Sequence, residues 1–279
     1  MLSRQVRARL ANTSRIRRAA PAQSASATAE QWHDLSHRTP QPACDLARGD
    51  EVSNSVGHHW IITESLESLW PACRKTLAKY EPQLEHFRIG EDVHPDLAIL
   101  ARRFPTATAF LDIETCGLGS AMVFLVGVIR QCQDQLVLTQ LWARNYAEEA
   151  AMLESLRSLL QTQSVLVTFN GKSFDWPVIR DRMTMHTRGQ PAGLPELAHV
   201  DLLHHSRRRW KEVLPNCKLQ TLERHLCGRH RNGDIPGSEI PDVYHDYVRS
   251  GDATEVRSIL HHNALDLITL LQLSLQILE

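Results

Sequence analysis

The sequence predicts an α/β fold in which helices flank a mixed five-stranded sheet. Three consecutive β-prone apolar runs begin near residue 108, and the connections between them are short. Two further apolar runs then alternate with segments of helical spacing, and residues 253–278 have the spacing of one long final helix. Strands and helices in the order β-β-β-α-β-α-β-α predict a mixed sheet with helices on its faces.

The first three strands are expected at residues 108–113, 122–130 and 136–142. The second and third are separated by the turn-like pair Gln133 and Asp134. Because connections of this length hold no crossover helix, the three strands are predicted to form an antiparallel meander.

The second half of the pattern alternates helix and strand. Apolar positions at helical spacing predict a helix over residues 148–160, and the run 164–169 predicts a buried strand that ends at the turn Asn170-Gly171. A second helix is expected shortly after this turn, followed by a strand at 197–200 and by mostly helical structure. This succession is the plan of ribonuclease-H-like folds.

The chain divides into three predicted parts. Residues 1–50 form a disordered basic and polar tail, residues 51–104 a small accessory segment, and residues 105–279 the main domain. The tail is rich in arginine and has no acid in its first 29 positions, which is typical of a solvated tail with weak nucleic-acid contact and also of an organelle transit peptide. In the accessory segment, residues 52–62 predict a short strand pair and residues 65–80 a helix.

The composition is that of a globular protein outside the membrane. Hydrophobic residues make up 42% of the chain and charged residues 23%, and no apolar run approaches the roughly 18 residues of a membrane span. The 6 cysteines include no C-x-x-C pair, so reduced thiols and a cytoplasmic location are expected. Because the formal net charge is only -1, nucleic acid would have to be bound by local basic patches and metal.

Two acids stand two positions apart at the end of the first predicted strand, in Phe110-Leu111-Asp112-Ile113-Glu114-Thr115. Since strand side chains alternate, Asp112 and Glu114 point to one face. Two neighbouring anions repel each other unless a cation lies between them or one is protonated. The pair is therefore a candidate for a divalent metal site, and the simpler alternative is a solvated strand end.

A third acid follows the strand at residues 164–169. Asp175 comes directly after Asn170-Gly171-Lys172-Ser173-Phe174, on the first turn of the predicted helix. An acid at a helix N-terminus is also favoured by the helix dipole, so Asp175 has a purely structural alternative.

The final helix carries His261-His262-Asn263-Ala264-Leu265-Asp266. His262 and Asp266 are four residues apart and lie on one helical face, one turn from each other, whereas His261 points away from that face. A His and Asp at this spacing are also a common surface hydrogen-bonding pair.

Together the three motifs resemble the DEDD (DnaQ-like) exonuclease superfamily, and within it the YprB-like ribonuclease-H-like domain proteins. The resemblance extends through three stretches outside the catalytic motifs, at residues 199–204, 218–223 and 234–241, and covers roughly residues 105–279. The superfamily has two branches, which differ in the residue that precedes the last Asp of the motif. One branch has a His five positions before this Asp, and the other has a Tyr four positions before it. Here His262 occupies the tyrosine-type position and His261 the histidine-type one, and we favour His262.

The resemblance implies a 3′-to-5′ exonuclease that hydrolyses phosphodiester bonds at a single-stranded DNA or RNA end. Asp112, Glu114, Asp175 and Asp266 would hold two Mg²⁺ or Mn²⁺ ions, which prefer hard oxygen ligands. His262, with an ordinary pKa of about 6.5, would accept or orient the proton of the attacking water.

The resemblance also implies six substrate-binding positions, each with a structural alternative. The backbone after the D-x-E pair, at Thr115, Gly117 and Leu118, would meet the terminal nucleotide, and its alternative is a glycine turn beside a core leucine. Lys172 is placed for a phosphate contact or is merely solvated. The other two positions are Asn170, for which helix capping is the favoured alternative, and Phe174, which would otherwise be core.

A basic run, Arg207-Arg208-Arg209-Trp210-Lys211, would follow a nucleic-acid backbone with Trp210 stacked on a base, or else form a charged helix face with Trp210 in the core. Two rival functions use the same fold. One is a catalytically idle ribonuclease-H-like module that binds nucleic acid or a protein; a missing carboxylate would favour it, and none of the four is missing. A transposase or resolvase would not usually place its first two acids as a D-x-E pair.

Overall fold

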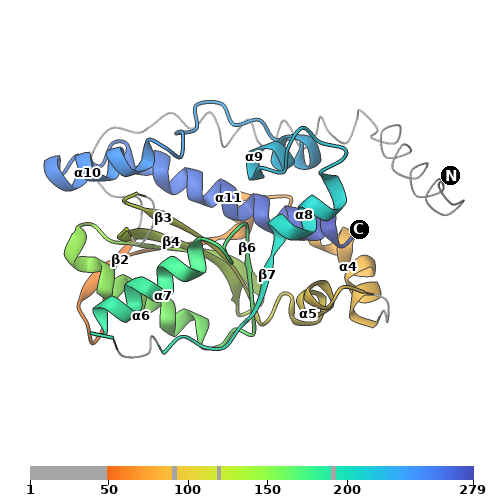
Figure 1. The fold of residues 1–279 in the computed structure, drawn as a ribbon, viewed down its shortest axis with the longest axis horizontal. Coiled ribbons are helices and arrows are strands. Elements are labelled where there is room, and N and C mark those ends of the chain that lie inside the picture. Colours follow the sequence, from red (N-terminus) through yellow and green to blue (C-terminus); the bar gives the residue numbers. More distant parts are fainter. Residues whose placement is uncertain (1–48, 90–92, 118–120, 190–192) are drawn as a thin grey trace, which may run out of the picture.

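The computed structural model describes residues 49–89, 93–117, 121–189 and 193–279 (Figure 1). The tail predicted at residues 1–50 therefore lies, except for its last two residues, outside the described residues. The structure is built around one sheet, with helices on both of its faces (Figure 1).

The sheet has seven strands in the order β1-β2-β5-β4-β3-β6-β7. Neighbours from β1 to β3 in this order are antiparallel, whereas β6 runs parallel to β3 and β7 parallel to β6. The strands are β1 (Asp50–Ser53), β2 (His58–Ser65), β3 (Thr108–Thr115), β4 (Val123–Cys132), β5 (Gln135–Trp142), β6 (Val165–Thr168) and β7 (Ala198–Asp201).

The predicted mixed α/β fold of ribonuclease-H-like type is confirmed, and β3, β4 and β5 form the predicted meander. The sheet has seven strands rather than five because β1 and β2 of the accessory segment extend it beyond β5. Pairing with β2 satisfies the backbone groups that β5 would otherwise expose at an open edge. The division of the chain near residue 104 stays a prediction.

The helices contribute to two hydrophobic cores. One core contains α3, α4, α5, α8, α9 and most of α11, and the other contains α6, α7, α10 and the start of α11. The helices are α3 (Leu66–Leu69), α4 (Cys73–Ile89), α5 (Pro95–Arg103), η1 (Tyr146–Glu148), α6 (Glu149–Leu160), α7 (Asp175–His186), α8 (Leu202–Trp210), α9 (Leu219–Leu222), the π-helical turn η2 (Glu223–Cys227), α10 (Ile240–Ser250) and α11 (Val256–Ile277).

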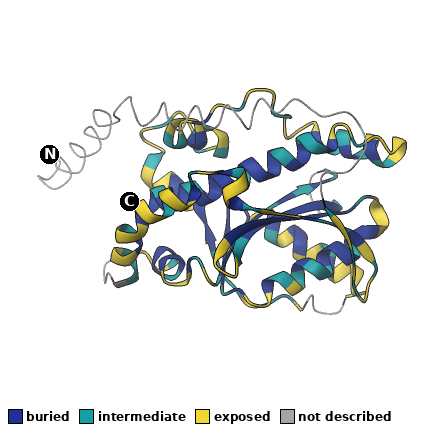
Figure 2. Ribbon diagram, turned by 180° about the vertical axis from the view of Figure 1, so that it is seen from behind, coloured by how far each residue is buried: buried dark blue, intermediate teal, exposed yellow. Residues whose placement is uncertain are grey.

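The long helix α11 crosses one face of the sheet and is buried along most of its length (Figure 2). On β3, Phe110 belongs to the core that contains most of α11, whereas Leu111 and Ile113 belong to the core of α6 and α7. Because strand side chains alternate, Asp112 and Glu114 share the α11 face with Phe110. This alternation brings the acids of β3 and the polar residues of α11 together.

The segment between β7 and α11 is less regular than the sequence pattern indicates. Between the helical turn η2 and α10 it includes a loop without regular helix, residues 228–239, which contributes to the site described below. Among the described residues, no helix is both long and apolar enough to cross a bilayer.

Candidate active site

Asp112 on β3 is held by a side chain of α11. Asn263 Nδ2 donates a hydrogen bond to Asp112 Oδ2 at 2.8 Å. Asn263 Oδ1 in turn accepts a hydrogen bond from Gln140 Nε2 on β5 at 3.0 Å, and the same Gln140 group donates to the Leu260 carbonyl at 2.8 Å. Asn263 is fully buried, so this chain of hydrogen bonds fixes the carboxylate of Asp112.

Gly127 makes room for this chain. It lies on β4 directly between Asp112 on β3 and Gln140 on β5. A Cβ atom at Gly127 would lie 2.1 Å from Asn263 Oδ1 and 2.5 Å from Leu267 Cδ1, closer than Cβ atoms come to other heavy atoms. The sequence interpretation gave no role to Gly127, Gln140 or Asn263, although Asn263 stands inside the H-N-x-x-D motif.

Asp175 is the first residue of α7 and is only 5% exposed. Its carboxylate accepts hydrogen bonds from the backbone of Asp175 itself and of Ile113, the residue between Asp112 and Glu114. A hydrogen bond to β3 places this acid beside the D-x-E pair. The structure thus brings together the first three predicted ligands from two different elements.

Asp201 at the end of β7 holds the loop that precedes Asp175. Its carboxylate accepts hydrogen bonds from the backbone N–H groups of Asn170 at 2.8 Å and Lys172 at 3.1 Å, and it also caps α8 through Leu203 N–H at 3.0 Å. Asp201 is only 1% exposed. It was part of a stretch noted only for resemblance, and the sequence gave no direct indication of this role.

The expected helix cap at Asn170 is not formed. The N-cap of α7 is Phe174, without a side-chain cap, while Asn170 is exposed and has a left-handed backbone with φ 65°. Asparagine tolerates this conformation better than most residues, which explains its place in a turn. Its side chain therefore does not serve α7.

The other predicted substrate positions lie around the same strand ends. Thr115 is buried and donates a hydrogen bond to the Gly117 carbonyl at 2.7 Å, whereas Leu118 lies outside the described residues. Phe174 is half-buried and packs against the core of α6 and α7. Lys172 is exposed.

Asp266 on α11 is paired with a cation from the loop at residues 228–239. Arg231 Nη2 donates to Asp266 Oδ1 at 2.5 Å, and its Nε donates to the buried Glu223 Oε2 at 2.6 Å. His262 Nε2 lies 3.6 Å from the other oxygen of Asp266. One side of Asp266 is thus neutralised by arginine, and the other faces the histidine.

His262, rather than His261, faces the acids. Burial alone would lower the pKa of His262, but its hydrogen bond to Asp234 and the negative charges of Asp266, Asp234 and Glu114 together raise it. Burial lowers the pKa of His261, which is half-buried. The placement supports the preference for His262 as the residue close to the reacting groups.

The acids disfavour one another's charge. Burial, followed by the charges of Asp266, Glu114 and Asp175, raises the pKa of Asp112 well above its usual range. Burial also raises the pKa of Glu114 to about 8; the charge of His262 opposes this shift, and the charges of Asp266 and Asp175 add to it. Burial likewise raises the pKa of Asp175 to about 7. Asp175 is buried and the other three acids are half-buried, and a group of oxygen ligands that repel each other fits Mg²⁺ or Mn²⁺ because a divalent cation relieves that repulsion.

This electrostatic arrangement predicts a pH-dependent stability. The folded-state pKa values of Glu114 and Asp175, about 8 and about 7, lie above the ordinary values of 4.5 and 3.8, so their contribution to stability is full only below these ordinary values and is lost as the pH rises through the folded-state values. Melting temperatures of the metal-free protein are therefore expected to fall between about pH 5.5 and 8.5. Mn²⁺ is expected to raise the melting temperature more at the upper end, because it binds the deprotonated acids.

Thermal melts in EDTA and in Mn²⁺ across this pH range check the prediction. In Glu114→Gln, which cannot ionise, the fall with pH should be smaller. A metal-free protein that becomes more stable toward pH 8.5, or a Mn²⁺ effect that does not change with pH, would contradict the electrostatic account.

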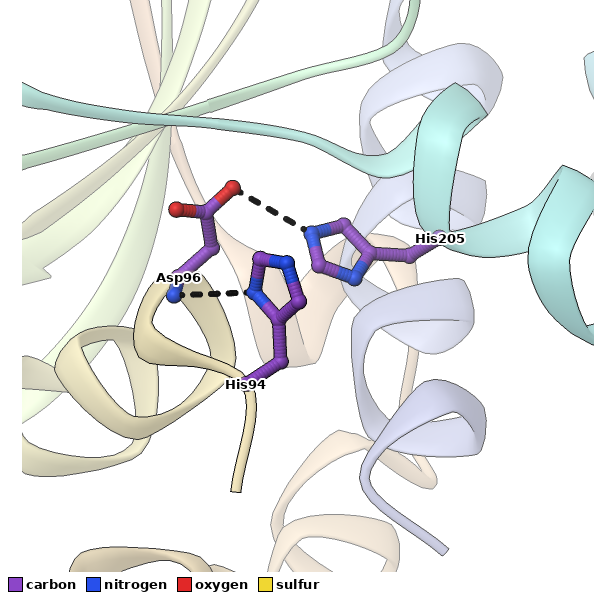
Figure 3. A group of neighbouring side chains, drawn as sticks. All are labelled: His94, Asp96 and His205. Carbon is purple, nitrogen blue, oxygen red and sulfur yellow. Dashed lines mark hydrogen bonds and ion pairs between the residues drawn. The ribbon is translucent and has the colours of Figure 1, made fainter. Parts of the chain in front are cut away.

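A second cluster, His94, Asp96 and His205, has the composition of a metal site (Figure 3). His94 Nδ1 accepts the backbone N–H of Asp96 at 3.2 Å, and His205 Nδ1 accepts Arg208 Nη2 at 2.8 Å. An imidazole that accepts through Nδ1 carries its proton on Nε2 and offers no lone pair there. His205 Nε2 accordingly donates to Asp96 Oδ2, at 3.4 Å.

Cations also surround this cluster. Arg208 contacts His205, and Lys172 Nζ lies 3.7 Å from Asp96 Oδ2, the oxygen that also accepts from His205. Burial, and then the charge of Arg208, lowers the pKa of His205 to about 4, so its imidazole is neutral. We interpret the cluster as a hydrogen-bond network that connects α5 and α8 with the loop carrying Lys172.

In the basic run of α8, Trp210 is half-buried and packs against the core of α11. Arg209 is directed to the C-terminal end of α11, where Nη1 donates to the Ile277 carbonyl at 2.9 Å. The structure favours the core interpretation of Trp210 over base stacking, while Arg207 and Arg208 are exposed.

The chain is similar to known proteins over the part that carries these residues. The model of the family RNase_H_2, described as RNase_H superfamily, matches residues 109–277. The uncharacterized protein YprB of Bacillus subtilis (strain 168) is 36% identical over 167 residues, 59% of this chain but 40% of YprB, so the chain spans well under half of that relative. The structure of the family B DNA polymerase from the hyperthermophilic archaeon Pyrobaculum calidifontis is similar with a TM-score of 0.48 and 15% identity, over 62% of this chain and 25% of that chain.

Proposed function

The chain belongs to the RNase_H_2 family of the RNase_H superfamily, and from this premise we propose that it is a metal-dependent 3′-to-5′ exonuclease acting on DNA or RNA. The observation that supports the proposal best is the convergence of four acids, from the C-terminal half of β3 (Asp112 and Glu114), the first residue of α7 (Asp175) and the middle of α11 (Asp266). Family membership alone does not establish an activity, so the proposal depends on these side chains.

The four acids would hold two Mg²⁺ or Mn²⁺ ions. Their donor atoms are hard carboxylate oxygens in a largely buried site, and the raised pKa values of three of them support a cation there, because it would relieve their mutual repulsion. Bound there, the ions would polarise the phosphodiester group and lower the pKa of water.

The side chains of the protein supply orientation and proton transfer. Asn263 keeps the Asp112 carboxylate in one position, and the backbone hydrogen bond from Ile113 of β3 does the same for Asp175. His262 Nε2, beside Asp266, would accept the proton of the attacking water. The strand end at Thr115 and Gly117, with Leu118 after it, and the exposed Lys172 are the proposed contacts of the terminal nucleotide.

The 3′-to-5′ polarity comes from the resemblance to the DEDD exonucleases. Single-stranded DNA and RNA labelled at the 3′ or the 5′ end, incubated with Mn²⁺, Mg²⁺ or EDTA, test the proposal. Loss of the 3′ label first, with stepwise shortening of the 5′-labelled strand that EDTA prevents, is the expected result. If no substrate is shortened by a folded, metal-loaded protein, the idle binding module becomes the better interpretation, and retention of labelled strands on the protein would identify it.

The two adjacent histidines are expected to differ in effect. Replacing His262 by alanine should lower kcat at neutral pH by about 10²- to 10⁴-fold, the usual contribution of a general base. Replacing His261, which by helical periodicity lies off the face of α11 that carries His262 and Asp266, should lower kcat by less than about tenfold. Steady-state kinetics on one oligonucleotide compare the two variants directly, and the reverse order would assign the general base to His261.

A further inference from the structure

The loop at residues 228–239 places an acid, Asp234, beside the Nδ1 nitrogen of His262. His262 Nδ1 lies 2.9 Å from Asp234 Oδ2, and the two side chains are only 7% and 8% exposed. A carboxylate only accepts hydrogen bonds, so the imidazole donates through Nδ1. Because Nδ1 carries the proton of this bond, Nε2 is the nitrogen that is free for another partner.

That free nitrogen faces the candidate catalytic acids. His262 Nε2 lies 3.6 Å from Asp266 Oδ2, and the charge of Glu114 acts on the same imidazole. Asp234 and Asp266 therefore lie on opposite nitrogens of one ring. The ring orientation that satisfies Asp234 is also the orientation that turns Nε2 toward the acids.

Asp234 is itself held in place by a buried group of charges. Arg231 Nη1 donates to Asp234 Oδ2 at 3.1 Å, and Arg231 Nε donates to Glu223 Oε2 at 2.6 Å. Glu223 is 1% exposed and also pairs with the buried Arg229 and with Thr269 Oγ1 of α11, the latter at 3.0 Å. The hydrogen bonds from His262 and Arg231 lower the pKa of Asp234 despite its burial, so its carboxylate is ionised.

We propose that Asp234 is a positioning residue, which holds His262 through Nδ1 so that Nε2 is presented to the attacking water. An acid on one imidazole nitrogen fixes the tautomer and the ring plane and stabilises the imidazolium formed when the other nitrogen takes a proton. This inference depends on the proposed hydrolysis, in which His262 is the base. Its structural part, the tautomer of His262, is independent of any activity.

Two substitutions separate charge from shape. Asparagine at position 234 keeps an oxygen that accepts the Nδ1 hydrogen but carries no charge, whereas alanine removes the partner altogether. Asp234→Ala is expected to lower kcat by about 10²-fold or more, with KM changed by less than about twofold. The kcat of Asp234→Asn is expected to lie between those of Asp234→Ala and wild type. Asp242→Asn, an exposed acid in the first turn of α10, is the matched control and should leave both constants unchanged.

A double-mutant cycle then tests whether Asp234 acts through His262. If it does, Asp234→Ala produces little further loss in kcat once His262 has been replaced by alanine. The proposal would be overturned if the fold-reduction in kcat of the double variant equalled the product of the two single reductions. It would also be overturned if Asp234→Ala changed KM alone. Circular dichroism and thermal melts of each variant show whether the loop has merely unfolded.

The tautomer of His262 provides a measurement without substrate or metal. In ¹⁵N-histidine-labelled, metal-free protein at a pH where the imidazole is neutral, the signals of His262 are assigned by their absence from His262→Ala. Wild type is expected to be protonated at Nδ1, and Asp234→Ala should shift the proton to Nε2. A Nδ1–H imidazole that survives in Asp234→Ala would overturn the positioning role, while a wild-type protein without hydrolysis but with the expected tautomer would refute only the proposed function.

Discussion

Replacing Asp112 or Asp175 by asparagine is expected to abolish hydrolysis while the fold is retained. Each substitution removes one negative charge from the proposed metal ligands but keeps the size of the side chain. Asparagine at position 112 can still accept the hydrogen bond from Asn263 Nδ2 that now measures 2.8 Å. The loss of one preorganised electrostatic group usually costs about 10²- to 10³-fold in kcat, and a metal ligand is expected to lie at the upper end.

The same substitutions are expected to stabilise the metal-free protein or to leave its stability unchanged. Burial and the neighbouring acids raise the pKa of Asp112, so its charge is unfavourable in the absence of a cation. Urea unfolding in EDTA, beside oligonucleotide cleavage in Mn²⁺, measures both effects. Asp134→Asn, an exposed acid in the turn between β4 and β5, is the control that should change neither. A well-folded Asp112→Asn or Asp175→Asn variant with wild-type activity would remove the basis of the proposed site.

Replacing Gly127 by alanine is expected to damage both stability and activity. The added methyl group would lie 2.1 Å from Asn263 Oδ1 and 2.5 Å from Leu267 Cδ1, and Asn263 cannot move aside without breaking its bonds to Asp112 and Gln140. Helix α11 must therefore shift away from β4 and carry Asp266 and His262 with it. Overpacking of this kind costs about 1–3 kcal/mol, and a displacement of about 1 Å in an active site can lower kcat about 10²-fold.

Gly57→Ala is a suitable control for this substitution. At Gly57 the nearest atom to an added Cβ is Ala151 Cβ at 3.5 Å, which is ordinary van der Waals contact. Urea unfolding and kcat, measured on both alanine variants, separate the steric effect from a general loss of glycine. If Gly127→Ala is as stable and active as wild type, then Asn263 does not pack over β4 as the structure has it.

The strands and helices that carry the three acidic motifs could be predicted from sequence because each motif lies in or directly after a strongly periodic segment. The alternation of apolar residues in β3 placed Asp112 and Glu114 on one face, and the hydrophobic cores on either side of the strand agree with that placement. The four-residue spacing of His262 and Asp266 likewise predicted two side chains on one face of α11, where they lie 3.6 Å apart.

The partners of these residues could not be predicted in the same way, because they depend on contacts between distant segments. Asn263 meets Gly127 and Gln140 only after α11 has packed on the sheet. Asp234 reaches His262 from an irregular loop, whose position is set by ion pairs of Arg231 rather than by any apolar period. The strand β2 pairs with β5 although 69 residues lie between the two strands, and the sequence pattern of β2 alone does not identify its partner.

The helix cap expected at Asn170 was wrong for a related reason. Asparagine before a helix favours capping by local chemistry, but here the carboxylate of Asp201 binds the backbone of the loop and sets its course. The helix α7 then begins at Asp175, five residues later, with Phe174 as its N-cap. Tertiary hydrogen bonds to the end of the neighbouring strand β7, rather than local helix-capping chemistry, thus set the conformation of this loop.

Anomalous diffraction from crystals grown with Mn²⁺ tests the central claim, that the four acids form a metal site, most directly. We expect anomalous peaks within bonding distance of Asp112, Glu114, Asp175 and Asp266. Arg231 is then expected to leave Asp266, or to contact only the Asp266 oxygen that does not bind the metal. Manganese bound at His94, Asp96 and His205 instead, or no manganese while Arg231 keeps its present contact with Asp266, would contradict the account.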